Sequence, residues 1–317
     1  MSHPLAIAFI HGIGRTERGY SEPMRRALAA AFASRIGRPT SETASELHFE
    51  EINWSPVLSR PETELWKRVH GGGPLRYDRL RDFMVHFAGD AVAYQPSPHD
   101  RSAYDAIHEA VAESLADLAE RAGPRAPLCV VAHSLGTVIA SNYLYDLMKR
   151  RGSYMGSTVR SRINGTPLER GETLALLVTM GSPIALWSLR YPGFGEPVRM
   201  PCIERHHPGL QGRWINIYDP DDVIGYPLRG LNAKYRKAVT EDQSVDVGSI
   251  LTRWTPLSHT AYWGSRKVAE TIADRLAEAW GASSAIALVP ERQARPRKAR
   301  ARSSATSSGK APGTPSA

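Results

Sequence analysis

The chain has 317 residues, 42% of them hydrophobic, which is enough to bury the core of one large domain or two small ones. Its formal charge is +8, but residues 291–317 hold seven Arg or Lys and one acidic residue, so the rest of the chain carries only +2. A basic nucleic-acid-binding face on the folded part is therefore not indicated, and only the tail is expected to contact anionic partners, weakly.

The two cysteines, Cys129 and Cys202, are too few for a disulfide framework and are compatible with a reducing compartment. Residues 1–10 contain no basic segment, and the apolar run from Leu5 to Ile10 is too short for a secretory leader or a membrane span. No zinc-binding pattern is present either. We therefore expect a cytoplasmic protein with no transmembrane segment, metal or cofactor.

The same apolar run, Leu5 to Ile10, predicts a strand that is buried on both faces of a parallel sheet. It ends at His11-Gly12-Ile13-Gly14, a glycine turn of the kind that joins a strand to a helix. No dinucleotide-binding or Walker pattern follows, so the turn does not indicate a phosphate site.

A helix is predicted from Ser21, which would cap it, to Ile36, with Gly37 as its stop. Leu47 to Trp54 is the next predicted strand. The order strand, helix, strand favours parallel pairing with a right-handed crossover.

Residues 55–99 exceed what one crossover needs, because Ser102 to Gly123 already predicts a crossover helix, with Ser102 and Asp105 as a capping box. We interpret residues 55–99 as an insertion with a helix near Tyr77 to Tyr94. Its apolar residues repeat at helical spacing: Leu80, Phe83, Met84, Phe87 and Ala91. This stripe either packs on the core or lines a cap over a site, and the sequence leaves both open.

A short apolar strand, Leu128 to Val131, runs into Ala132-His133-Ser134-Leu135-Gly136 and then into a helix that Gly152 ends. Small residues on both sides of a serine at such a junction let the backbone bend sharply, so that the hydroxyl projects from the strand end. The N-terminus of the following helix would favour negative charge beside Ser134. The alternative is that Ser134 simply caps a buried helix.

Residues 152–171 are expected to be irregular, and Leu174 to Met180 is the next strand, ended by Gly181-Ser182-Pro183. Ser182 is a second candidate nucleophile. Because the proline that follows it has no N–H, we assign Ser182 to a pocket wall instead.

Trp214 to Tyr218 is a further strand, with three acids at its end, Asp219, Asp221 and Asp222. Val245 to Val247 is the last predicted strand. Ser258-His259-Thr260 follows in a loop, before a closing amphipathic helix marked by Val268, Ile272, Leu276 and Trp280.

This order of turn, serine, acid and histidine resembles the α/β-hydrolase superfamily, in particular its lipase- and esterase-like serine hydrolases. The elbow has Ala132 where the family pattern G-x-S-x-G has its first glycine. The likeness extends from Leu5 to Trp280. It implies an α/β-hydrolase fold with a mainly parallel sheet of about six strands, helices on both faces and a possible helical cap. The domain would span residues 1–286, with a disordered basic tail at 287–317.

By resemblance, Ser134 is the nucleophile and His259 the general base, since among eleven histidines only His259 follows the acidic cluster. Asp222 is chosen to orient His259 because similar lipase-like chains have an acid before an apolar pair and a Tyr-Pro-Leu-like segment. Asp219 fits a turn cap, and Asp221 stays an alternative for the orienting acid.

The resemblance also places the backbone N–H groups of Ile13 and Leu135 in an oxyanion hole. The supporting residues around them are His11, Gly12, Gly14, His133 and Gly136. We expect cleavage of a small or lipid-like carboxylic ester or thioester through an acyl-enzyme. An acyltransferase with the same residues, or a binding protein on a hydrolase scaffold, are the alternatives.

Overall fold

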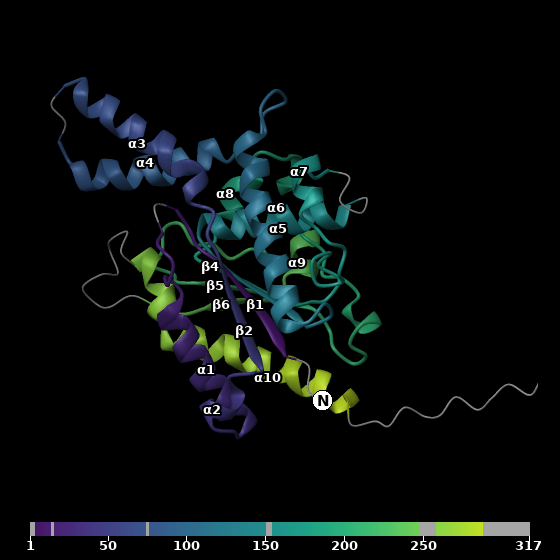
Figure 1. The fold of residues 1–317 in the computed structure, drawn as a ribbon. Helices are drawn as coiled ribbons and strands as arrows, with labels where there is room; N and C mark the ends of the chain where they lie inside the picture. Colours follow the sequence, from purple (N-terminus) through teal and green to yellow (C-terminus); the bar gives the residue numbers. More distant parts are fainter. Residues whose placement is uncertain (1–3, 14–15, 74–75, 150–153, 248–257, 288–317) are drawn as a thin grey trace, which may run out of the picture.

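Six parallel strands form one sheet at the centre of the molecule (Figure 1), in the order β2-β1-β3-β4-β5-β6. The computed structural model describes residues 4–13, 16–73, 76–149, 154–247 and 258–287. The strands are β1 (Leu5–Ile10), β2 (Leu47–Ile52), β3 (Leu128–His133), β4 (Leu174–Met180), β5 (Arg213–Tyr218) and β6 (Glu241–Ser244). Because every neighbouring pair is parallel, the carboxyl ends of all six strands lie at the same edge of the sheet. The predicted α/β class is confirmed.

Helices cover both faces of this sheet (Figure 1). On one face α1 and α10 pack against each other and against the sheet, and on the other face lie α5 and α6. These four long helices are α1 (Glu22–Ile36), α5 (Ser102–Ala122), α6 (Leu135–Met148) and α10 (Arg266–Ala287). Shorter helical segments are α2 (Thr40–Thr43), α7 (Ser157–Ser161), α8 (Ile184–Ser188), α9 (Ala233–Ala238), η2 (Pro192–Phe194), η3 (Ile203–Arg205) and η4 (Ser258–Gly264).

The central strand β3 contributes to both layers of the core. Cys129 and Val131 pack with α1 and α10, while Leu128, Val130 and Ala132 pack with α5 and α6. All six of its residues are buried. A strand covered on both faces has no solvent side on which a polar residue is favoured, and this explains the unbroken apolar run.

The expected insertion forms a pair of helices, α3 (Pro56–Gly71) and α4 (Asp78–Ala93), which project away from the sheet (Figure 1). The helix predicted near Tyr77 to Tyr94 is therefore confirmed. The side chains of Leu80, Phe83, Met84 and Phe87 lie outside the described residues, and Ala91 is half-buried. Whether the pair acts as a cap stays a prediction.

The last strand was predicted in the wrong place. It spans Glu241–Ser244 and ends before Val245, which donates its N–H to the carbonyl of Tyr218. The strand is polar because it lies at the edge of the sheet, where one side of the ladder and part of each face meet solvent. A search for apolar runs therefore finds the residues just after it.

Two predicted helix caps were also wrong. Ser21 precedes α1, but its hydroxyl donates to the carboxylate of Glu51. At the start of α5 the Asp105 carboxylate contacts Arg101, and Asp100 accepts the N–H of Ser102. At Ser21 the competing carboxylate comes from β2, and at Ser102 it comes from the nearby Asp100.

The connection predicted as irregular at residues 152–171 contains the short helix α7. The predicted end of α6 at Gly152 lies outside the described residues, as do residues 288–317 of the predicted tail. Cys129 and Cys202 are free thiols.

No described helix combines the length and apolar character that a membrane span requires. Within the described ranges there is also no cluster of three or more His, Cys, Asp or Glu residues that could hold a metal ion.

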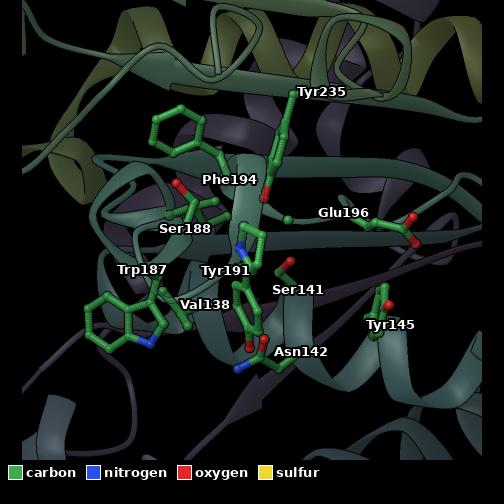
Figure 2. A pocket seen from close by; sticks show the side chains of 13 residues that line it. Val138, Ser141, Asn142, Tyr145, Trp187, Ser188, Tyr191, Phe194, Glu196 and Tyr235 are labelled. Carbon is green, nitrogen blue, oxygen red and sulfur yellow. The ribbon is translucent and has the colours of Figure 1, made fainter. Parts of the chain in front are cut away.

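A pocket of about 290 Å³ lies along α6 (Figure 2). One wall is the α6 stripe Val138, Ser141, Asn142 and Tyr145. The facing wall comes from α8 and the segment after it, residues 184–196, and Tyr235 of α9 completes the lining.

The first turn of α6 passes so close to the end of β1 that only glycine fits at position 136. A Cβ atom there would lie 2.3 Å from the carbonyl oxygen of His11 and 2.7 Å from that of Ile10. We expect Gly136→Ala to lower the free energy of unfolding by about 3 kcal/mol or more, because backbone must move to admit the methyl group. Gly281→Ala in α10, where a Cβ meets nothing within 4 Å, should instead stabilise by about 1 kcal/mol.

Urea unfolding followed by circular dichroism measures both variants. Equal stability of Gly136→Ala and the wild type would contradict the close crossing of α6 and β1.

Candidate active site

Ser134 occupies a strained turn between β3 and α6. Its φ of 53° and ψ of −129° lie in a region that residues other than glycine rarely adopt. Its N–H donates to the carbonyl of Met180 at 3.0 Å, and its own carbonyl accepts the N–H and the hydroxyl of Thr137 at 2.9 and 2.7 Å. A backbone conformation of this kind costs about 1–3 kcal/mol and persists only where the surroundings enforce it. Such strain is concentrated at functional sites, so the turn marks Ser134 as a candidate.

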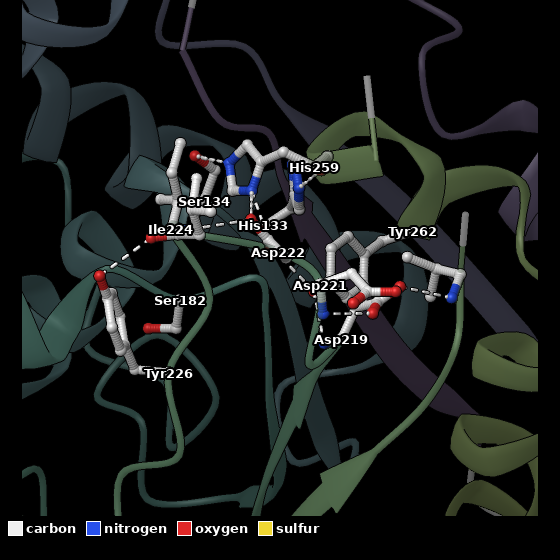
Figure 3. A network of polar contacts seen from close by, with 12 residues as sticks. His133, Ser134, Ser182, Asp219, Asp221, Asp222, Ile224, Tyr226, His259 and Tyr262 are labelled. Atoms are coloured by element: carbon white, nitrogen blue, oxygen red, sulfur yellow. Dashed lines mark hydrogen bonds and ion pairs between the residues drawn. The ribbon is translucent and has the colours of Figure 1, made fainter. Parts of the chain in front are cut away.

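The Ser134 hydroxyl donates a 2.6 Å hydrogen bond to Nε2 of His259 (Figure 3). His259 belongs to η4, 125 residues further along the chain. Since Nε2 accepts this bond in the neutral ring, we assign the ring proton to Nδ1. The Nδ1–H group faces the carboxylate of Asp222, 2.9 Å from Oδ2 and 3.1 Å from Oδ1. The fold thus brings together the serine, histidine and aspartate that the sequence singled out.

Three donors hold the Asp222 carboxylate. They are the His259 ring, the N–H of Ile224 at 3.0 Å and the hydroxyl of Tyr262 at 2.9 Å. Burial by itself raises the pKa of Asp222, but the hydrogen bond and charge of His259, with the other two donors, outweigh it and bring the pKa below its ordinary value. Asp222 is therefore ionised at neutral pH and fixes the orientation of His259.

The aspartates at the end of β5 have different contacts. Asp222 is the one in contact with His259. Asp219 accepts the N–H of Asp221 at 2.9 Å and that of Val247 at 2.8 Å, which agrees with the turn-capping role predicted for it. This geometry favours Asp222 over Asp221 as the orienting acid.

The turn after β1 lies directly against Ser134. A Cβ atom on Gly12 would be 2.6 Å from Cβ of Ser134, so a side chain is excluded there. His11 stacks on the indole of Trp54, with ring centroids 4.8 Å apart, and its carbonyl accepts the Trp54 N–H at 3.1 Å. Ile13 follows half-buried, and Gly14 lies outside the described residues. The oxyanion role of the Ile13 and Leu135 N–H groups stays a prediction.

His133, which precedes the serine, supports the backbone of the facing histidine. Its Nε2 donates to the carbonyl of His259 at 2.6 Å. Burial, helped by the nearby His259, lowers the pKa of His133 to about 3. Burial likewise lowers the pKa of His11 to about 4, so both rings are neutral at physiological pH.

Ser182, the second serine considered, has a different set of partners. Its hydroxyl bonds to that of Thr137 at 2.8 Å and accepts the N–H of Ile184 at 3.3 Å. Ile184 lines the pocket along α6, whereas Ser182 itself is fully buried behind it. These contacts give Ser182 a structural role and leave Ser134 as the serine that bonds to a histidine.

The three side chains are enclosed, with Ser134 at 0%, His259 at 2% and Asp222 at 4% exposure. Removal from water strengthens the electrostatic interactions among them. It also means that a ligand reaches the Ser134 hydroxyl only when neighbouring side chains move.

No protein-family model matches the chain, and no curated protein matches it. Among solved structures, the chain is similar to the esterase domain of a Rhodothermus marinus protein. The sequence identity is 12%, the match covers 88% of this chain and 87% of that one, and the TM-score is 0.32. A likeness of this size does not bear on the activity of the chain.

Tyr262 is a site residue that the sequence reasoning missed. Its hydroxyl accepts the N–H of Asp219 at 2.9 Å and donates to Asp222, so it links the turn cap to the orienting acid. It stands three residues after His259 in a 3₁₀ helix, where positions i and i+3 share one face. If a 3₁₀ helix had been predicted around His259 instead of a loop, Tyr262 would have been expected on the same face as His259.

The buried neutral histidines give stability a definite pH dependence. A histidine whose pKa is lowered on folding stabilises the fold above pH 6.5, and that contribution is lost as pH falls, because the unfolded chain takes up the proton first. From pH 7 to pH 5, His11 and His133 should each cost about 2 kcal/mol of unfolding free energy. We expect His133→Gln to flatten this dependence, whereas His99→Gln, at an exposed position, leaves it unchanged.

Urea titrations between pH 5 and 7 measure the slopes. A His133→Gln slope equal to that of the wild type would show that His133 is not held neutral.

Proposed function

We propose that the protein is a serine hydrolase that cleaves a carboxylic ester or thioester through an acyl-enzyme. The contact that carries the proposal is the 2.6 Å hydrogen bond from Ser134, on its strained turn, to Nε2 of His259. A serine hydroxyl is a weak nucleophile at neutral pH unless a base takes its proton as it attacks. A serine that only caps a helix does not require a histidine in contact with its hydroxyl group, and it does not require a strained backbone.

In the first half of the reaction, the Ser134 oxygen attacks the substrate carbonyl carbon while its proton passes to Nε2 of His259. Asp222 stabilises the resulting imidazolium through Nδ1–H without taking the proton itself. The tetrahedral intermediate then collapses, the bond to the alcohol or thiol breaks, and His259 gives its proton to that leaving group. Ser134 is left as an ester of the acyl group.

In the second half, water takes the place of the leaving group. His259 accepts a proton from the water as it attacks the acyl-serine, and then returns a proton to the Ser134 oxygen. The products are the carboxylic acid and the original enzyme. Proton transfer and nucleophilic attack account for the whole cycle, so the proposed reaction requires no cofactor.

Negative charge on the carbonyl oxygen must be stabilised in both halves. We assign this to the backbone N–H groups of Ile13 and Leu135, because Gly12 packs on Ser134 and Leu135 begins α6. The N-terminus of α6 adds the positive end of its dipole. One oxyanion donor is worth on the order of 3 kcal/mol in a transition state.

The proposal predicts that Ser134 is the residue that a fluorophosphonate probe labels. Wild type and Ser182→Ala should both be labelled, because Ser182 bonds to Thr137 and not to a histidine. Ser134→Ala should be unlabelled and should lose hydrolysis of p-nitrophenyl esters across a panel from acetyl to palmitoyl. Labelling of Ser134→Ala, located by mass spectrometry, would contradict the assignment.

A second prediction concerns the orienting acid. Asp222→Asn keeps the shape of the site but removes the charge that holds His259, and kcat should fall by a factor on the order of 10⁴. Asp221→Asn is the matched control, one residue away, and should keep kcat close to the wild-type value. Circular dichroism checks that both variants fold. Near-normal kcat for Asp222→Asn would remove Asp222 from the proposed mechanism.

A further inference from the structure

The pocket along α6 is rich in aromatic side chains. Trp187, Tyr191, Phe194 and Tyr235 stand around one space (Figure 2), and Tyr145 of α6 adds a fifth ring. Aromatic walls with a few polar groups are typical of sites for small organic ligands. The volume of about 290 Å³ suits one or two fused rings.

Both helical walls of this pocket begin at the candidate active site. α6 starts directly after Ser134, and its first pocket residue, Val138, lies roughly 6 Å further along the helix axis at 1.5 Å per residue. The other wall follows Gly181, where a Cβ atom would meet Oδ2 of Asp222 at 3.0 Å and Cε1 of His259 at 3.2 Å. A group attached to a carbonyl at Ser134 is therefore within reach of the pocket.

The pocket wall is held in place by a strained segment and a side-chain clamp. Gly193, Phe194 and Gly195 all have positive φ, and Phe194 at 62° does so against the preference of a residue with a side chain. The Asn232 amide donates to the carbonyls of Gly193 and Gly195, at 2.8 and 3.2 Å.

The same Asn232 side chain accepts the N–H groups of Lys234 and Tyr235 at the start of α9. One residue thus links the backbone on both sides of Phe194 to the helix that carries Tyr235. A rigid wall of this kind lowers the ordering cost of binding a ligand.

The charges around the pocket argue against a cationic ligand. The ammonium of Lys149 lies 4.7 Å from the ring centre of Tyr145, and the guanidinium of Arg190 lies 5.7 Å from that of Tyr191. The carboxylate of Glu196 is paired with Lys234 at 2.6 Å. The rings of Tyr145 and Tyr191 therefore already meet cations of the protein, whose positive charge would repel an ammonium ligand.

We infer that this pocket binds an aryl group, and that this group is the acyl or the alcohol part of the ester cleaved at Ser134. The link to the ester rests on the proposed function. The ring would lie among the side chains of Trp187, Tyr191 and Phe194.

Binding is tested on the Ser134→Ala variant by isothermal titration calorimetry, so that no hydrolysis is needed. We expect 2-naphthoate to bind at least about ten-fold more tightly than cyclohexanecarboxylate, which has no aromatic face, or phenyltrimethylammonium, which carries the opposite charge. Equal affinities, or a preference for the ammonium compound, would overturn the inference.

Two further variants locate the bound ring. In the Ser134→Ala background, Trp187→Leu and Phe194→Leu each keep an apolar side chain without a ring, and each should weaken 2-naphthoate about five-fold. Trp66→Phe, in α3, is the control and should bind as before. Unchanged affinity in both pocket variants would place the ligand elsewhere and contradict the assignment.

Kinetics on the otherwise wild-type enzyme then identify which part of the ester carries the ring. Trp187→Leu should raise KM about five-fold for methyl 2-naphthoate if the ring is on the acyl side, or for 2-naphthyl acetate if it is on the alcohol side. KM for ethyl butyrate, which has no ring, should not change. Unchanged KM for both aryl esters would overturn the link to the substrate. If naphthoate binds as expected but no ester is cleaved, the proposed function fails and the aryl site stands.

Discussion

Two stretches of backbone meet at the carboxyl edge of the sheet with no room for a side chain between them. The turn after β1 packs on the Ser134 turn, where Gly12 faces Ser134 and Gly136 faces the carbonyls of Ile10 and His11. This close packing is possible because both positions lack a Cβ. It sets the position of the serine relative to the sheet, and every other contact of the site is built on that position.

The remaining groups reach this point from distant parts of the chain. β5 delivers Asp222 and η4 delivers His259, while the backbone of His259 is held by His133, the residue before the serine. Tyr262 closes the network by bonding to both Asp219 and Asp222. Each of these groups is buried, and each polar contact is made inside the protein, where removal from water makes it stronger and makes its loss more costly. The arrangement therefore has one geometry and little freedom to take another.

Much of this could be predicted from the sequence, because the central strands are buried on both faces and so leave an unmistakable apolar run. The serine and the histidine followed from motif order and residue type, and Asp222 was chosen for its place before an apolar pair and a Tyr-Pro-Leu-like segment. The structure brings these three side chains into contact. The edge strand β6 could not be found in this way, since an edge position tolerates polar residues.

Contacts that depend on tertiary structure could not be predicted from the sequence either. Neither the bond from His133 to the His259 carbonyl nor the strained φ of Phe194 leaves a pattern in the residues around it. The caps expected at Ser21 and Ser102 were lost to carboxylates: that of Glu51, which only the fold brings near Ser21, and that of Asp100, two residues before Ser102. Local propensity is a weak guide where a distant charge supplies a better hydrogen bond.

The position of η4 and α10 in the chain has a consequence for how the protein is made. Synthesis delivers the N-terminal segments first, so β1, α1, β3 and the Ser134 turn leave the ribosome well before residues 258–287. Until those residues emerge, Ser134 has no histidine beside it, and the apolar face of α1 lacks the helix α10 that covers it. A nascent chain thus carries Ser134 without its histidine partner. The contact between Ser134 and His259 forms in the same late step in which α10 covers one face of the sheet.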